Sequence, residues 1–542
     1  MTDERKPNSR QAELNSLPIG NVLVIAPAGC GKTDALAFRA SSTLARGAVP
    51  TPRKILALTY SNKAKDNLKS RLWKVVGAGW QQRIHVTNFH GLAARVIRAH
   101  GSLLGIRPDI ALPEKSWRRQ RLRDLGIGWK ESDAFESALR TAKSGSPDDA
   151  EVIRRLRDIG HSDALAFEES LRADGRLDYD DLIRQCSRLL QIEKVARLYQ
   201  AHFGMVMVDE VQDLSVAQYE MVRGVGGDTV TYAGDPAQGI YSFAGADPVE
   251  VFRRIRELSP VEVELNQSYR SAPAVLRAVN ALAIEIGSTL LECGEPDRWP
   301  DGGHVILVER DNTDDEAQAV ISLISELLVD PSTTVAVVAR RGTRMDPLRR
   351  AADTARIPYQ DWSVPTHVPR IVDLLQSHVR QAIGGDCTAS EQCLRLETLC
   401  RTDVDDSDTD TLDEIAAACD VLRELVDHGR TLEQAVASCR PALDSSVPVA
   451  PGLHILTGHL GKGQEFDWVF VVGLENGQVP DFRSETQQQI DEELRVLHVM
   501  VSRARVGLVV TFSAQAMTKH GWRATEPSPW LGCLRDAATA RR

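Results

Sequence analysis

The sequence predicts an α/β protein in which helices flank parallel sheets, and three observations carry this prediction. The apolar run at residues 21–25 leads into a glycine-containing turn and then a helical pattern over 34–46, which Gly47 closes. A second apolar run, at 204–208, ends in adjacent carboxylates, and a third, at 229–233, ends in polar residues. Short runs rich in apolar and β-branched residues are typical of strands buried in a parallel sheet.

The chain has 542 residues, which is too long for one core and predicts about three to four domains. Nine cysteines, an odd number in a long chain, do not fit a secreted disulfide framework. A charged start and the lack of any apolar run near ~20 residues predict a cytoplasmic protein that makes no use of a membrane. The net charge of −10 excludes a uniformly basic coat but leaves room for a local basic groove.

Residues 26–33, Ala-Pro-Ala-Gly-Cys-Gly-Lys-Thr, fit a phosphate-binding loop between the first strand and the first long helix. Its glycines let backbone amides turn inward around an anionic phosphate at a helix N-terminus. Lys32 places a point charge on the β- and γ-phosphates, and the Thr33 hydroxyl can ligate Mg²⁺. The sequence therefore predicts binding of a nucleoside triphosphate. The predicted loop contacts are Ala28, Gly29, Cys30, Gly31, Lys32 and Thr33.

Gln11 lies upstream of this loop, and its amide can donate and accept at once, which suits the edge of adenine. A solvated glutamine is the ordinary alternative. Two segments that follow predicted strands suit contacts to a single nucleic-acid strand: Thr59 with Asn62, and Phe89 with His90. For the second pair, local packing and helix capping are the simpler interpretation when the residues are taken alone.

Residues 92–183 show a mostly helical pattern. Within them, Trp117 is closely followed by four arginines, an arrangement that can track a nucleic-acid backbone and stack a base. A solvated helix face with one buried tryptophan explains the same pattern equally well.

The carboxylates at the end of the 204–208 run are the second strong signal, because parallel sheets build sites at strand ends. Asp209 can hold Mg²⁺, and Glu210 can polarise an attacking water as a general base. A simple acidic turn is the alternative, but a phosphate loop in the same chain favours catalysis. Beyond the 229–233 run, Gln238 is a candidate γ-phosphate sensor, and Tyr241 and Phe243 are candidates to face bases.

Taken in order, these segments resemble the motifs of UvrD/Rep-type superfamily 1 DNA helicases, and the resemblance covers most of the chain. The matching segments are Gln11, 26–33, 59–64, 88–91, 209–213, 234–246, 267–270, 457–466 and 491–504. The resemblance implies that Tyr269 stacks on adenine, that Glu465 binds the ribose, and that Phe243 stacks a base. His459 lies in the motif that couples DNA contacts to the ribose. Arg270 and Arg503 are then expected to act on the γ-phosphate from the second-lobe side of the nucleotide cleft.

The same resemblance implies two RecA-like lobes with ATP between them, each interrupted by a helical insertion, the second one reduced. The expected divisions are 1–91 and 186–275 for the first lobe, 92–185 for its insertion, 276–372 and 448–542 for the second lobe, and 373–447 for the small insertion.

Three positions depart from the family pattern: Asp34 stands where arginine is usual, Gln464 replaces a leucine and His498 a tyrosine. The small insertion also holds five cysteines, which raises the question of a metal site. Cys393 and Cys400 are two helical turns apart on one face, so we interpret them as small buried hydrophobes.

The implied function is ATP hydrolysis with Mg²⁺, coupled to 3′-to-5′ movement on single-stranded DNA and to unwinding of tailed duplexes. The setting would be DNA repair, replication or phage defence. An alternative is a DNA-gated ATPase subunit that regulates a partner nuclease and unwinds little itself. A non-catalytic scaffold is disfavoured because every expected catalytic position is filled: Lys32, Asp209, Glu210, Gln238, Arg270 and Arg503.

Overall fold

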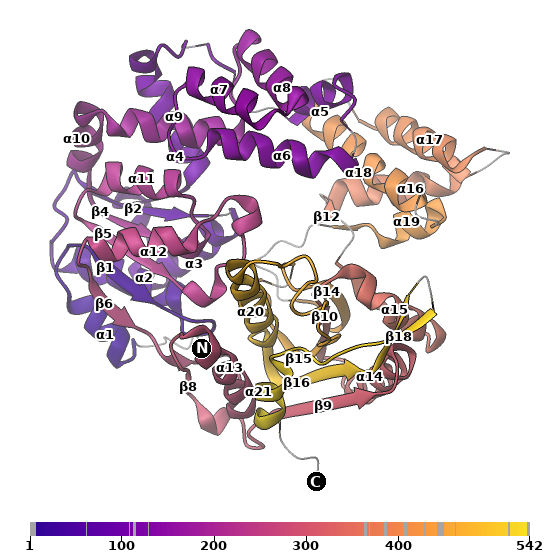
Figure 1. The fold of residues 1–542 in the computed structure, drawn as a ribbon. Coiled ribbons are helices and arrows are strands. Elements are labelled where there is room, and N and C mark those ends of the chain that lie inside the picture. The colour runs from indigo at the N-terminus through magenta and orange to yellow at the C-terminus, as the bar shows by residue number, and fades with distance from the viewer. Residues whose placement is uncertain are drawn as a thin grey trace. The chain divides into compact units, whose positions relative to one another are not determined.

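The computed structural model divides into two compact units, which are described separately below (Figure 1). The first comprises residues up to 270 together with 283–295, and the second comprises 271–282 together with the chain from 296 onward. The structure describes residues 7–60, 62–107, 109–111, 115–127, 129–362, 366–367, 369–383, 387–404, 409–427, 430–441, 449–460, 462–518 and 521–538.

The first unit is built on a six-stranded sheet with the order β3-β2-β4-β5-β1-β6, in which every neighbouring pair is parallel. Its strands are β1 (Val22–Ile25), β2 (Lys54–Thr59), β3 (Ile84–Asn88), β4 (Phe203–Val208), β5 (Val230–Gly234) and β6 (Val261–Glu264). The central strands β1, β4 and β5 are buried along their whole length, as expected when helices cover both faces of a sheet. Because all strands run the same way, their carboxyl ends share one edge.

Helices cover this sheet (Figure 1), and those that follow β3, β4 and β5 or precede β4 share one apolar core with its strands. The covering helices are α1 (Ser9–Ser16), α2 (Lys32–Ala45), α3 (Asn62–Val76), α4 (Phe89–His100), α9 (Tyr179–Gln191), α10 (Glu193–His202), α11 (Val216–Gly226) and α12 (Pro248–Glu257). Short elements near the strand ends are the 3-10 helices η3 (Val211–Asp213), η4 (Pro236–Gln238) and η5 (Ser242–Ala244), and the strands β7 (Gln267–Ser268) and β8 (Glu292–Cys293).

A helical insertion between α4 and α9 has a small core of its own, centred on Phe135 and Phe167. Its helices are α5 (Lys115–Asp124), α6 (Trp129–Lys143), α7 (Asp149–Ile159) and α8 (Ser162–Ala173).

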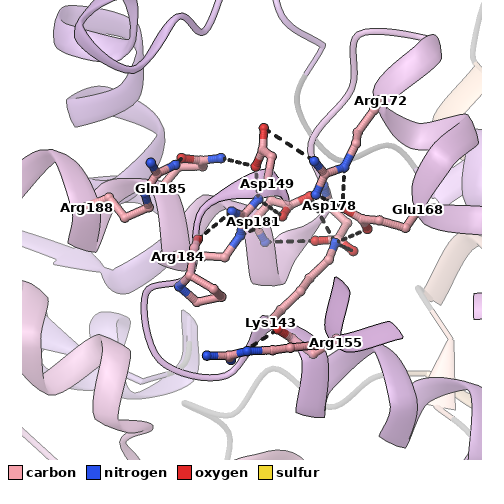
Figure 2. Close-up of polar contacts among 12 residues, drawn as sticks. Lys143, Asp149, Arg155, Glu168, Arg172, Asp178, Asp181, Arg184, Gln185 and Arg188 are labelled. Atoms are coloured by element: carbon pink, nitrogen blue, oxygen red, sulfur yellow. Dashed lines mark hydrogen bonds and ion pairs between the residues drawn. The ribbon is translucent and has the colours of Figure 1, made fainter. Parts of the chain in front are cut away.

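A buried ion network ties this insertion to α9 (Figure 2). The ammonium of Lys143, at the end of α6, lies 2.8 Å from a carboxylate oxygen of Glu168, 2.6 Å from Asp178 and 3.0 Å from Asp181. Arg184 adds a further bond to Asp181. The opposite charges therefore compensate each other in a buried site, and they connect the insertion to the start of α9.

The second unit contains another fully parallel six-stranded sheet, with the order β11-β14-β10-β15-β16-β9. Its strands are β9 (His304–Arg310), β10 (Thr334–Ala339), β11 (Tyr359–Asp361), β14 (Gly452–Thr457), β15 (Phe466–Val471) and β16 (Ala504–Ser513). The remaining elements are α13 (Pro273–Ile286), which belongs to both units, α14 (Thr313–Leu327), α15 (Asp346–Thr354), α20 (Gln487–Val501), α21 (Leu531–Ala537) and the antiparallel hairpin β17 (Gln515–Thr518) with β18 (Gly521–Ala524).

The insertion of the second unit is a small helical cluster: α16 (Pro369–Ile383), α17 (Ala389–Thr402), α18 (Thr409–Asp427) and α19 (Leu432–Ser438), with the short strands β12 (Thr366–His367) and β13 (Arg440–Pro441). Four cysteines lie in its apolar core: Cys393, Cys400, Cys419 and Cys439. Their burial among leucine, valine and alanine side chains supports their interpretation as small hydrophobes. No helix in the described part of the chain is long and apolar enough to span a membrane.

Candidate nucleotide site and nucleic-acid pocket

The phosphate loop connects β1 to α2 and depends on two glycines with left-handed backbone geometry. Gly29 has φ +83° and Gly31 has φ +71°, backbone angles that residues other than glycine rarely adopt. A Cβ on Gly29 would also lie 2.7 Å from the Cβ of Arg270, so the backbone approach itself requires glycine. Gly31 caps α2 without any side-chain hydrogen bond, which leaves the first amides of the helix available to an anion.

Lys32 points toward the two carboxylates that end β4. Its ammonium lies 3.1 Å from Asp209 Oδ1 and forms a second ion pair with Glu210. Burial alone would lower the pKa of Lys32, but the two carboxylates outweigh it and the pKa is raised. A lysine, two carboxylates and the adjacent Thr33 hydroxyl are the donor set that a Mg²⁺-triphosphate needs, so these residues fit ATP with its metal.

Glu210 has an unusual backbone with φ 57°, a strained value for a residue that is not glycine. Its carboxylate accepts a hydrogen bond from the Gln212 amide, and the Gln212 oxygen accepts one from the backbone N–H of Asp235 at 3.0 Å. The Asp235 carboxylate in turn accepts a hydrogen bond from Gln238 at 2.8 Å. The candidate general base is thus connected to the candidate γ-phosphate sensor through Gln212, to which the sequence analysis assigned no role.

Gln11 and Tyr269 are both bonded to the phosphate loop, and Asn8 links them to each other. Gln11 donates from Nε2 to the carbonyl of Gly31 at 3.5 Å, while its oxygen accepts from the backbone of Asn8 at 3.1 Å. The Asn8 amide donates to the Tyr269 hydroxyl at 2.9 Å, and the Tyr269 N–H donates to the carbonyl of Gly29 at 3.0 Å. Asn8 is a site residue that the sequence analysis missed, although its spacing from Gln11 is that of a helix capping box.

Arg270 corrects one expectation, because it belongs to the first unit together with the phosphate loop and does not come from the second lobe. The reason is local. The backbone of Tyr269 is bonded to Gly29, so the chain crosses beside the loop before it leaves the first unit. Arg270 therefore lies in the same unit as Lys32.

A pocket of about 590 Å³ opens in the first unit at the carboxyl edge of the sheet. Tyr60 follows β2, His90 begins α4, and Gly245 follows η5, and all three line this pocket. Arg140, from α6 of the insertion, lines it as well, and a Cβ on Gly245 would lie 2.9 Å from the Arg140 Cδ. The pocket thus joins three segments that the sequence analysis singled out, and adds an arginine that it did not.

Two residues that the sequence analysis predicted as DNA contacts, Thr59 and Phe89, are buried in this structure. Phe89 is 1% exposed and packs in the core of the first unit, while Thr59 is fully buried at the end of β2. Asn88 caps α4 by accepting from the N–H of Gly91 at 2.8 Å, so capping and packing explain this segment. His90 does reach the pocket, where its ring meets Tyr179 edge-on at 5.3 Å and burial lowers its pKa.

Three further predicted DNA contacts, Tyr241, Asn62 and Phe243, stay predictions. Tyr241 is half-buried just before η5. Asn62 begins α3 and Phe243 lies within η5, but their side chains fall outside the described ones. Trp117 packs edge-on against Phe167 and donates to Asp174, which favours its structural interpretation.

In the second unit, Glu465 and Arg503 immediately precede β15 and β16, whereas His459 follows β14. Arg503 is 1% exposed, and its Nε donates to the carbonyl of Val499 at 2.9 Å. Glu465 is exposed just before β15. Burial, reinforced by nearby Arg340 and Lys462, lowers the pKa of His459 to about 4.

Asp34 stands where the family pattern has arginine, and in this structure it pairs with an arginine from another helix. The Nε of Arg71, from α3, lies 3.3 Å from Asp34 Oδ1. The structure therefore supplies a cation beside the phosphate loop from another helix.

Two parallel sheets, a glycine-dependent phosphate loop and a paired lysine and acid site define a P-loop nucleotide-binding protein of the α/β class. Residues 7–258 match the model of the UvrD/REP helicase N-terminal domain, and residues 386–515 match that of the UvrD-like helicase C-terminal domain. The chain belongs to the UvrD/REP helicase family.

Similar proteins align over almost the whole chain. The ATP-dependent DNA helicase UvrD2 of Mycobacterium tuberculosis (strain ATCC 25618 / H37Rv) is 27% identical over 599 residues, which cover 97% of this chain and 81% of the relative. The ATP-dependent DNA helicase PcrA of Staphylococcus aureus (strain Mu50 / ATCC 700699) is 24% identical over 629 residues, covering 97% and 85%.

Proposed function

We propose that this UvrD/REP helicase hydrolyses ATP to move along single-stranded DNA, in the 3′-to-5′ direction, and thereby unwinds tailed duplexes. The observation that carries the proposal is the pairing of Lys32 with Asp209 and Glu210 beside a glycine-dependent phosphate loop. The names of the relatives support ATP as the nucleotide and DNA as the substrate.

The nucleotide would be held mainly by residues of the first unit. The amides of residues 28–31 and the ammonium of Lys32 would bind the phosphates, and Thr33 with Asp209 would hold Mg²⁺. The metal would neutralise charge on the phosphates when bound. Lys32 then exchanges its carboxylate partners for phosphate oxygens, which releases Glu210 to accept a proton from water.

The link between hydrolysis and DNA would run through Gln212. Glu210 and Asp235 share this glutamine, and Gln238 is bonded to Asp235. The segment that follows Gln238 reaches Gly245 at the wall of the pocket. We propose that single-stranded DNA binds at this pocket, so a change at the γ-phosphate would have a bonded path through Gln212, Asp235 and Gln238 to the segment that lines it.

Strand displacement by the purified full chain tests the proposal. A labelled duplex with a 3′ single-stranded tail is expected to open with ATP and Mg²⁺, whereas a 5′-tailed duplex stays closed. The Glu210→Gln variant serves as the inactive control. DNA-stimulated hydrolysis without displacement on either substrate would favour the alternative of an ATPase subunit that acts with a partner nuclease.

A further inference from the structure

One fully buried arginine connects the helix that carries Gln11 to the helix that begins at the phosphate loop. Arg39 belongs to α2, and its side chain is completely shielded from solvent. Burial, together with the nearby charge of Arg46, lowers the pKa of Arg39 to about 10, so the guanidinium stays charged at neutral pH. A buried charge is costly unless polar groups replace its water, so the atoms around Arg39 indicate its role.

The end of α1 supplies most of these atoms. Arg39 Nη1 donates to the carbonyl of Leu14 at 2.6 Å and to that of Leu17 at 3.4 Å. Its Nη2 donates to the carbonyl of Pro18 at 3.1 Å, and its Nε donates to the Thr231 hydroxyl of β5 at 2.9 Å. The last carbonyls of a helix lack partners within the helix and carry partial negative charge. The arginine and the end of α1 therefore satisfy each other.

The other end of α1 holds the residue that is predicted to read adenine. Gln11 lies in the first turn of α1 and is 5% exposed, and its Nε2 donates to the carbonyl of Gly31 at 3.5 Å. With eight residues, α1 is too short to be stable by itself in water, so its position depends on its contacts. Gln11 bonds it to the phosphate loop at one end, and Arg39 bonds it to α2 at the other.

We propose that Arg39 is a positioning residue for recognition of the nucleotide base: by fixing α1 to α2, it holds Gln11 against the phosphate loop and so sets the preference for adenine. The proposal rests on the proposed function and adds a residue outside the motifs that led to it. Because α2 begins with Lys32, one side chain joins the part of the site that binds phosphate to the part that reads the base.

The alternative is that Arg39 stabilises the first unit without any influence on the choice of base. Two further residues of α2 help to separate these roles, since Ser42 donates to the carbonyl of Asn15 at 3.0 Å and Arg46 donates to that of Leu17 at 3.1 Å. We therefore expect α1 to stay attached when Arg39 is replaced, with Gln11 displaced from its place beside the loop.

Equilibrium titration with ADP and GDP measures the choice of base without turnover. Arg39→Met is expected to weaken ADP binding about 2- to 10-fold, the loss of one hydrogen bond to the base, and to leave GDP binding unchanged. Arg39→Lys keeps the charge and should recover part of the loss. Arg10→Met removes an exposed ion pair with Glu13 from the same helix, and as the matched control it should bind both nucleotides like wild type. Equal weakening of ADP and GDP binding by Arg39→Met would overturn the positioning role.

A melting curve accompanies each variant. If Arg39→Met does not fold, Arg39→Lys is judged by the same ratio of ADP to GDP affinity, and a wild-type ratio then contradicts the proposal.

A double-mutant cycle tests whether Arg39 acts through Gln11. Gln11→Ala alone should reduce the preference for ADP, and adding Arg39→Met should cause no further loss, because the side chain to be positioned is already absent. Additive losses would contradict the proposal. If the wild-type chain binds neither nucleotide, the proposed function fails together with this inference. If wild type prefers ADP and folded Arg39→Met keeps that preference, this inference alone fails.

Discussion

Lys32 and Glu210 touch in the structure, yet their replacements are expected to act differently. Lys32→Ala removes the phosphate anchor and leaves two carboxylates facing each other, so it should weaken ATP binding and abolish turnover. Glu210→Gln keeps the shape of the base while removing its proton acceptor, so ATP should bind and persist. Nucleotide titration with both variants separates the roles, and an equal loss of ATP affinity would contradict them.

Gln212 allows a test of positioning at a single side chain. Because it bonds Glu210 and the backbone of Asp235, Gln212→Ala is expected to lower kcat about 10- to 100-fold with little change in ATP affinity. Gln434→Ala, which removes a glutamine from the cap of α19, is the control and should leave kcat unaltered. Steady-state hydrolysis gives kcat, and a nucleotide titration gives the ATP affinity of each variant. A loss of ATP affinity as large as the loss of kcat would contradict the positioning role.

His459 predicts a pH dependence of stability. Its pKa falls from 6.5 to about 4 in the folded chain, so the unfolded chain takes up a proton first as the pH drops. The contribution of neutral His459 to the stability of the folded chain is complete above pH 6.5, the unfolded pKa. This contribution is lost as the pH falls from 6.5 toward about 4, the folded pKa. Melting temperatures compared near pH 7 and near pH 5 should therefore fall less in His459→Gln than in wild type. A drop of the same size in both proteins would show that His459 is not the group responsible.

At the scale of elements, the buried ion network sets the position of the first insertion. Lys143→Met leaves Glu168, Asp178 and Asp181 without their central cation, and such a loss destabilises by about 3–5 kcal/mol. Hydrogen exchange in α6 and α8 should rise accordingly. Arg154→Met removes exposed ion pairs with Glu151 and Asp158 from the same insertion and should change exchange little. Equal protection in both variants would mean that the network does not hold the insertion.

The strand-loop-helix motif and the acidic strand end were predictable because local patterns determine them, whereas the second parallel sheet was expected from the family resemblance. The phosphate loop needs glycine for its backbone, and short apolar strands need burial on both faces. The family motif favoured a DNA contact for Phe89, whereas the residues taken alone favoured packing, and the core position of Phe89 in α4 agrees with packing. Arg140 was missed because its partner, Gly245, is distant in sequence and is reached only through the insertion.

At the scale of the whole molecule, the two arginines that we predict to act in hydrolysis belong to different units. Arg270 belongs with the phosphate loop, whereas Arg503 lies in the second unit, held by the carbonyl of Val499. If hydrolysis depends on closure of the two lobes, a residue of the second unit must complete a reaction whose other groups belong to the first. Arg503 is the residue that we expect to do so.

Arg503→Ala is therefore expected to reduce kcat by about 10³- to 10⁵-fold, the usual contribution of an arginine finger, while single-strand binding stays close to wild type. Arg505→Ala is a close control, since Arg505 lies two residues away, in the same unit, and makes a half-exposed pair with Asp467 at 3.3 Å. That control should retain hydrolysis and lose about 1 kcal/mol of stability at most. Because Arg503 is buried, a melting curve must accompany the kinetics, and Arg503→Lys keeps the charge if alanine unfolds the chain. Folded Arg503→Ala with near-wild-type turnover would mean that the first unit hydrolyses ATP without the second.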